Sequence, residues 1–134
     1  MSKIFTHRLR VYYEDTDMAG IVYYANYLRF IERGRSDWVR DIGMDQNRMK
    51  DDFGIVFAVK RIEADYIAPA RLDDVLVVET TLSDVKGARF TMEQRVRRED
   101  QPLFTATVQI VVMTLEGRPT RLPAEIRALL DGKS

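Results

Sequence analysis

The chain has 134 residues, a common size for one domain, and we predict a single domain over residues 1–134. Lys and Arg together number 21, as do Asp and Glu, so no net positive charge attracts nucleic acid as a general field. The chain has no Cys and only one His, which excludes disulfides and thiol nucleophiles and argues against a histidine-based triad.

The N-terminal segment has no apolar signal core, and no run approaches the roughly 18 apolar residues of a membrane span. The lack of Cys also suits a reducing compartment. We therefore predict a cytoplasmic protein with no stable membrane insertion.

Residues 5–13 alternate between mostly apolar and mostly polar side chains, which predicts a half-buried first strand. The strand is expected to end in residues 14–20, where acidic residues and Gly20 are typical of a turn.

One long helix is predicted next, because apolar residues recur every three to four positions. They are Tyr27, Ile31, Trp38 and Ile42. Asn26 is the expected N-cap, although a start at Tyr23 or Tyr24 fits almost as well, and Gly43 is a suitable stop. Gly34 lies on the apolar stripe, where glycine costs about 1 kcal/mol relative to alanine, so we expect another backbone to approach it closely.

A second short helical turn is expected at residues 45–52, and a short helix closes the chain at residues 123–132. Between them the sequence predicts four strands, at residues 55–68, 74–85, 88–98 and 103–115. The short breaks favour hairpins between antiparallel neighbours. The predicted fold class is therefore α+β, with one long helix packed on a curved antiparallel sheet. Because a single helix covers one face only, we expect a second copy to cover the other, giving a homodimer or a homotetramer.

The segment from Glu14 to Tyr24 places three carboxylates near helix-terminal N–H groups that no helical carbonyl satisfies. Such groups can bind an oxyanion, and a nearby carboxylate can act as base or nucleophile. A thioester suits this arrangement, since a thiol with a pKa of about 8.5 can leave without a strong general acid. The alternative is that the acids only cap the helix and form a turn.

The string RVYYEDTDMAGIVYYANY at residues 10–27 resembles the signature of the 4-hydroxybenzoyl-CoA thioesterase family of hot-dog-fold proteins. The string DYIAPARLDD at residues 65–74 is similar to the branch associated with the Tol-Pal envelope system. The resemblance covers nearly the whole chain and implies a hot-dog fold that hydrolyses acyl-CoA to free acid and CoA, without a cofactor.

The resemblance places the catalytic carboxylate on Asp17, as general base or as nucleophile, and gives Asp15 a structural role. It places the oxyanion-binding N–H group at about Tyr24, where many members of the Tol-Pal branch have histidine instead. Further substrate contacts are expected at Gly20, Val22 and Tyr27, although Tyr27 also follows the apolar face of the helix.

Lys86 and Arg89 flank Gly87 in a predicted hairpin and offer two cations for the phosphates of CoA. The resemblance supports this role, and the alternative is an ordinary solvated turn. Arg71 and Arg118 are weaker candidates.

No metal site is expected. His7 alternates with strand residues and has no Cys partner, and Glu14, Asp15 and Asp17 lack the spacing of a calcium loop.

Two other functions remain open from the residues. A hydratase or dehydratase of acyl thioesters would need an acid and a base together, and no suitably placed His is present. A binding module for acyl-CoA or for another protein would keep the groove without turnover.

Overall fold

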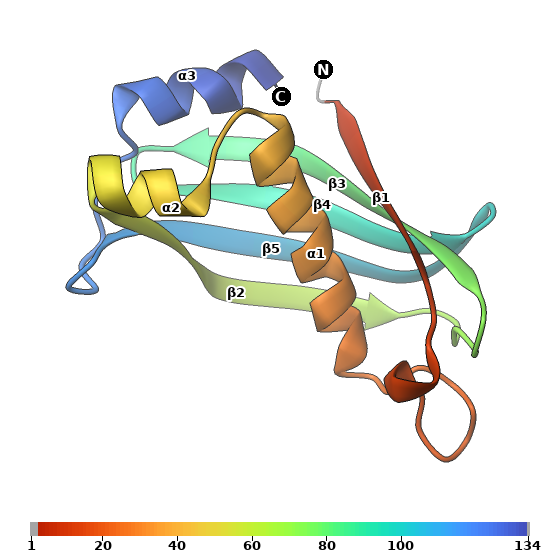
Figure 1. The fold of residues 1–134 in the computed structure, drawn as a ribbon. Helices are drawn as coiled ribbons and strands as arrows, with labels where there is room; N and C mark the ends of the chain where they lie inside the picture. The colour runs from red at the N-terminus through yellow and green to blue at the C-terminus, as the bar shows by residue number, and fades with distance from the viewer. Residues whose placement is uncertain (1–2, 134) are drawn as a thin grey trace.

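The computed structural model describes residues 3–133, in which one long helix lies across a five-stranded sheet (Figure 1). In chain order the elements are β1 (Ile4–Arg10), the 3-10 turn η1 (Tyr13–Asp15), α1 (Asn26–Asp41), α2 (Gln46–Arg48), the π-helical turn η2 (Met49–Phe53), β2 (Ile55–Tyr66), β3 (Val75–Lys86), β4 (Arg89–Arg98), β5 (Gln101–Thr114) and α3 (Ala124–Lys133). The predicted α+β class and element order are confirmed.

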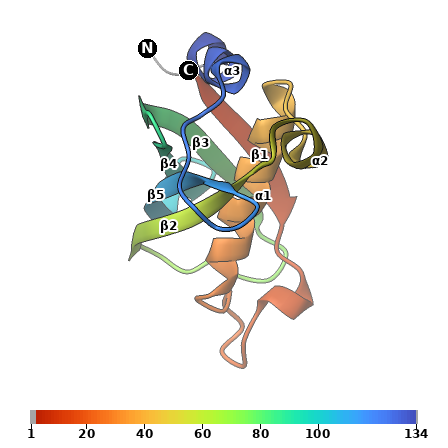
Figure 2. The same cartoon turned by 90° about the vertical axis from the view of Figure 1, so that its left-hand side faces the viewer.

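The sheet has the strand order β1-β3-β4-β5-β2, and every neighbouring pair is antiparallel. Strands β1 and β2 are therefore its edges. A tight hairpin joins β3 to β4, with Lys86 opposite Arg89. Figure 2 shows α1 on one side of the sheet and α3 at one end.

Helix α1 packs closely on the sheet at Gly34. A Cβ atom there would lie 2.8 Å from Cγ1 of Val78 and 3.1 Å from Oγ1 of Thr80. The expected close approach is thus present, but side chains of β3 make it rather than a backbone. Substituting Gly34 would force the helix and the sheet apart.

A polar network sits beside this contact. The Gln94 amide donates to the carbonyl of Ile31 and to Oγ1 of Thr80, at 2.8 and 2.9 Å. Arg35 donates to the Gln94 oxygen at 2.9 Å, and burial lowers the pKa of this arginine. Because Gln94 binds a helix carbonyl from inside the core, it fixes the position of α1 on the sheet.

The predicted cap of α1 is wrong. The N-cap is Ala25, which makes no side-chain cap bond, and the Asn26 side chain points inward. Its amide donates to the main-chain and side-chain oxygens of Asp15, both at 3.3 Å. A buried partner in the preceding turn therefore replaces the local cap. The predicted stop is confirmed, since Gly43 follows the helix with φ +93°.

The sheet face opposite α1 is largely polar, contrary to the expectation that it needs cover. A concave region of about 730 Å³ lies there. The polar side chains lining it include Glu63, Asp65, Glu79, Thr81, Glu93, Arg95, Thr105 and Thr107. Water can solvate such a face, so its burial is not a strong reason for a second copy.

Two smaller differences concern single residues. Strand β5 begins at Gln101 and includes Pro102, where a break was expected. His7, the lone histidine, lies 2.6 Å from a carboxylate oxygen of Asp37 and links β1 to α1. Within the described chain, no helix is both long enough and apolar enough to cross a bilayer.

Candidate active site

Residues 16–22 form a small hairpin between β1 and α1, projecting beyond the sheet in Figure 1. The Asp17 N–H donates to the carbonyl of Ile21 at 2.9 Å, and the Gly20 N–H donates to the carbonyl of Asp17 at 3.0 Å. Gly20 has φ +78°, a left-handed conformation that glycine adopts without strain. These two bonds therefore fix the backbone of Asp17, which follows Thr16, and Gly20 forms the bend of the hairpin.

Asp15 anchors this hairpin from its buried side. Its side chain is only 7% exposed, and its carboxylate accepts from the backbone N–H of Tyr12 at 2.9 Å and from Asn26. Its carbonyl also accepts from the N–H of Tyr23 at 2.9 Å. The first acid of the segment thus ties β1, the hairpin and the start of α1 together.

Asp17 is exposed, unlike Asp15. One of its carboxylate oxygens accepts from the backbone N–H of Ala19 at 2.9 Å. Among residues 3–133 no cation lies within ion-pairing distance of this carboxylate. The local turn orients the side chain and leaves the other oxygen available to water or to a substrate.

The start of α1 supplies the unpaired donors. Asn26 donates to the carbonyl of Tyr23 at 2.8 Å, and Leu28 donates to the carbonyl of Ala25 at 3.1 Å. The N–H groups of Tyr24 and Ala25 donate to no acceptor in the described chain. Free N–H groups at the positive end of a helix suit an oxyanion.

Two predicted substrate contacts lie in the core. Val22 is 3% exposed and Tyr27 is 3% exposed. The Tyr27 ring stacks on Phe104, its hydroxyl accepts from the N–H of Ala70 at 3.0 Å, and burial raises its pKa. In this chain both residues support the hairpin from inside, and their contact with substrate stays a prediction.

Lys86 and Arg89 border a cavity of about 510 Å³ at the far end of the sheet. Lys60, from β2, lies at the same cavity, with apolar walls from Val111 and Pro119. Sequence reasoning missed Lys60, because a single lysine in a strand gives no local signal. Three cations around a partly apolar cavity can bind a phosphorylated nucleotide.

The two regions lie at opposite ends of β3. Asp17 belongs to the end where Val11 bonds with Asp74 and Ile21 pairs with Arg71. The cations belong to the other end, and the 12 residues of β3 between them span roughly 36 Å. One chain therefore does not bring Lys86 and Arg89 to Asp17.

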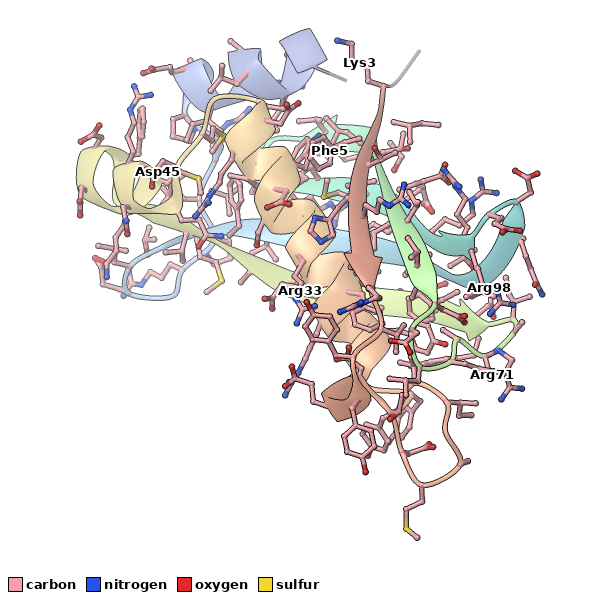
Figure 3. The ribbon with its side chains drawn as sticks, turned by 45° about the vertical axis from the view of Figure 1, so that its right-hand side comes forward. Lys3, Phe5, Arg33, Asp45, Arg71 and Arg98 are labelled. Atoms are coloured by element: carbon pink, nitrogen blue, oxygen red, sulfur yellow. The ribbon has the colours of Figure 1, made fainter. Side chains whose placement is uncertain are left out.

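The two weaker candidates separate in the same way. Arg71 is exposed beside the Asp17 hairpin, and Figure 3 shows it on the loop before β3. Arg118 is exposed in the turn after β5, where its N–H donates to Thr114. Neither lies at the cavity of Lys60.

A groove of mixed polar and apolar lining, which sequence reasoning also missed, runs between α1 and the sheet. It has a volume of about 320 Å³, and Trp38, Phe57 and Phe90 are among its walls. Arg35 and Glu32 also line it. The aromatic part of this lining can hold an acyl group.

No group of three or more His, Asp or Glu side chains in residues 3–133 is arranged to hold a metal ion. Glu14, Asp15 and Asp17 do not converge, because Asp15 turns inward while the other two are exposed. The chemistry available at this site is that of a carboxylate and backbone donors.

Three comparisons with known proteins bear on this site. The acyl-CoA thioesterase YbgC of Haemophilus influenzae is 42% identical over 125 residues, 92% of each chain. The probable thioesterase from Bartonella henselae has a TM-score of 0.86 and 39% identity, covering 90% of this chain and all of that one (100%). An aspartate-to-asparagine variant of 4-hydroxybenzoyl-CoA thioesterase, solved with 4-hydroxybenzoyl-CoA, has a TM-score of 0.88 and 25% identity, covering 94% and 97%.

These findings confirm the resemblance to hot-dog-fold thioesterases, including the Tol-Pal-associated branch to which YbgC belongs. The family match extends over residues 11–130 and so includes both the Asp17 hairpin and the cavity of Lys60, Lys86 and Arg89. The chain belongs to the thioesterase-like superfamily.

Proposed function

We propose that this protein hydrolyses acyl-CoA thioesters, with Asp17 as the catalytic carboxylate. The observation that carries the proposal is that the same segment presents an exposed carboxylate, Asp17, and the unpaired N–H groups of Tyr24 and Ala25. The names of the relatives support the substrate class. The neighbour solved as an aspartate variant with its substrate supports an essential aspartate.

In the general-base route, Asp17 takes a proton from water, whose oxygen attacks the carbonyl carbon of the thioester. The carbonyl oxygen becomes an oxyanion, and the N–H groups at the start of α1 stabilise it. The carbon–sulfur bond then breaks, and the CoA thiolate takes the proton held by Asp17. In the nucleophilic route, Asp17 attacks the carbon itself, the carbon–sulfur bond breaks and CoA leaves as its thiolate. Water then hydrolyses the resulting anhydride to the free acid and the Asp17 carboxylate, and the proton released goes to the thiolate.

The decisive variant is Asp17→Asn, which keeps the shape of the side chain and removes its basicity. We expect kcat for a good acyl-CoA substrate to fall roughly a thousand-fold, within the range for loss of a general base. Glu14→Gln is the matched control, because Glu14 is an exposed acid of the same segment. Release of thiol by a folded Asp17→Asn protein at the wild-type rate would refute the proposal.

We further propose that Lys60, Lys86 and Arg89 bind the phosphates of CoA. Since they lie about one strand length from Asp17 in the same chain, the complete site needs a second copy. Strand β2 is a sheet edge with exposed Val56 and Val59, so edge-to-edge pairing of two chains is the route that we favour. The acyl group would then lie in the groove beside α1, and the cytoplasm remains the predicted location.

Hybrid assemblies test the shared site. Asp17→Asn chains and Lys86→Ala/Arg89→Ala chains, carrying different tags, would be co-expressed and purified through both tags. A hybrid dimer in which each site uses two chains contains one site with neither defect. At low substrate concentration it should have about half the wild-type activity per dimer. If each chain forms its own site, the hybrid will show only the average of the two parent variants.

A further inference from the structure

The turn that leads into α1, residues 23–25, is unusual in what its carbonyl groups bind. The carbonyl of Tyr23 accepts from Asn26, and that of Ala25 accepts from Leu28. Between them, the carbonyl of Tyr24 accepts no backbone N–H in the described chain. Its partner is the hydroxyl of Tyr66, which donates at 2.8 Å from the end of the edge strand β2.

This bond affects where the helix begins. In a regular helix the Tyr24 carbonyl would accept from Leu28, and α1 would extend toward the hairpin. Here Leu28 bonds to Ala25 instead, and α1 begins at Asn26. The N–H groups of Tyr24 and Ala25 would be unpaired with either start, because the first N–H groups of a helix have no intrahelical acceptor. The bond from Tyr66 therefore affects where these N–H groups lie, not whether they are free.

The bond also acts on a donor directly. The Tyr24 carbonyl belongs to the same peptide unit as the Ala25 N–H group. A hydrogen bond accepted by a carbonyl polarises its peptide unit and strengthens the N–H as a donor. The Tyr66 hydroxyl thus favours an anion at the Ala25 N–H group.

The surroundings of Tyr66 keep its hydroxyl in place and protonated. Its ring packs edge-on against Phe104, with ring centroids 4.9 Å apart, and against Tyr27 at 5.6 Å. Burial raises its pKa, with a smaller contribution from Tyr24, so the hydroxyl stays a donor. Tyr66 is nevertheless half exposed, so its ring is not needed only to fill the core.

We propose that Tyr66 is a positioning residue for thioester hydrolysis: by binding the Tyr24 carbonyl it holds the Tyr24–Ala25 peptide unit at the start of α1 and strengthens the oxyanion-binding N–H group of that unit. The inference rests on the proposed function and adds a residue 42 positions from Tyr24 in sequence to the machinery of that site.

Tyr66→Phe tests this role, because it removes the hydroxyl and keeps the ring. We expect kcat to fall about ten-fold, less than the hundred-fold or greater loss from removing an oxyanion donor outright. The KM should change by less than about two-fold, since the bond acts on charge that develops only in the transition state. Affinity for a non-hydrolysable acyl-CoA thioether, measured by calorimetry, should likewise stay within about two-fold, because a thioether has no carbonyl oxygen.

Tyr23→Phe is the matched control. Tyr23 belongs to the same aromatic cluster, with its ring 4.9 Å from that of Tyr24, but its hydroxyl has no hydrogen-bond partner in the described chain. We expect its kcat and KM to equal those of the wild type. Equal kinetics for Tyr66→Phe and Tyr23→Phe would overturn the inference. So would a Tyr66→Phe variant that weakens thioether binding as much as it lowers kcat, since that result indicates a general structural role.

Asp17→Asn, assayed in parallel, separates this inference from the proposed function. If Asp17→Asn is inactive while Tyr66→Phe equals the wild type, the positioning role fails and the catalytic carboxylate stands. If Asp17→Asn hydrolyses acyl-CoA at the wild-type rate, the proposed function fails and the positioning role fails with it.

Discussion

At the hairpin between β3 and β4, Lys86 and Arg89 carry positive charges that no carboxylate of the described chain approaches within ion-pairing distance. On β4, by contrast, Arg95 and Arg97 both bind Glu79, at 2.7 and 3.2 Å. The cations of the hairpin are free to bind a ligand, whereas those of the strand hold β3 to β4.

The aspartates of the segment between β1 and α1 differ in the same way. The Asp15 carboxylate is buried and accepts from Tyr12 and Asn26. The Asp17 carboxylate is exposed and, among residues 3–133, accepts only from Ala19, two residues away. Among these charged side chains, the structural ones form ion pairs or several hydrogen bonds within the chain. Those without such partners are available to bind a ligand or to react. Substitutions on each side of this division should change different measured quantities.

After Asp17→Asn, the largest effect is expected from Lys86→Ala/Arg89→Ala. Each lost charge contact with a CoA phosphate should cost about ten-fold in affinity. The KM for acyl-CoA should therefore rise about 100-fold, with kcat and stability nearly unchanged. The matching acyl-pantetheine ester, which lacks the nucleotide, serves as the control substrate. A comparable rise of KM for that ester would assign the loss to something other than nucleotide binding.

Asp15→Asn should give the opposite pattern to Asp17→Asn. The new amide cannot accept from both Tyr12 and Asn26, so a buried donor loses its partner, and we expect about 2 kcal/mol less free energy of unfolding. The kcat should fall by less than about ten-fold. Denaturant unfolding and thiol release, measured on both variants, check the contrast. Loss of stability in Asp17→Asn alone would reverse the two assignments.

Much of the fold could be predicted from periodicity. The three-to-four spacing of apolar residues predicted α1 to within about one residue, and alternation predicted the first strand. The other four strands were predicted from strand-like runs between turn residues. The cap of α1 was mispredicted, because the Asn26 side chain binds Asp15 across the turn instead of capping locally. Such a choice depends on tertiary position, which spacing does not encode.

The outer face of the sheet could have been interpreted better. Glu79, Thr81, Glu93 and Arg95 occupy alternate strand positions, a pattern that already predicts a solvated face. The expectation of cover followed from counting helices instead.

The candidate site was only partly accessible to sequence reasoning. Asp17 and Tyr24 were predicted from the family signature, since turn composition alone favours a helix cap. Lys60 and Tyr66 come from β2 and meet their partners only through the strand order of the sheet. Contacts of this kind have no local spacing from which to predict them.

The smallest effect is expected from Glu79→Gln, and it depends on pH. Burial alone would raise the pKa of Glu79, but the bonds from Arg95 and Arg97 outweigh it and hold the pKa below the ordinary value of 4.5. A carboxyl whose folded pKa is depressed stabilises the fold above its unfolded pKa, and this contribution disappears as pH falls through the folded value. The free energy of unfolding of the wild type should therefore exceed that of Glu79→Gln by about 1 kcal/mol at pH 7. This difference should shrink once pH falls below about 4.5. The KM for acyl-CoA should not change, because Glu79 is ion-paired with Arg95 and Arg97 within the chain.

Urea unfolding of the wild type and Glu79→Gln at several pH values measures the difference in free energy of unfolding. If this difference stays constant down to acid pH, the ion pairs with Arg95 and Arg97 contribute no charge-dependent stability.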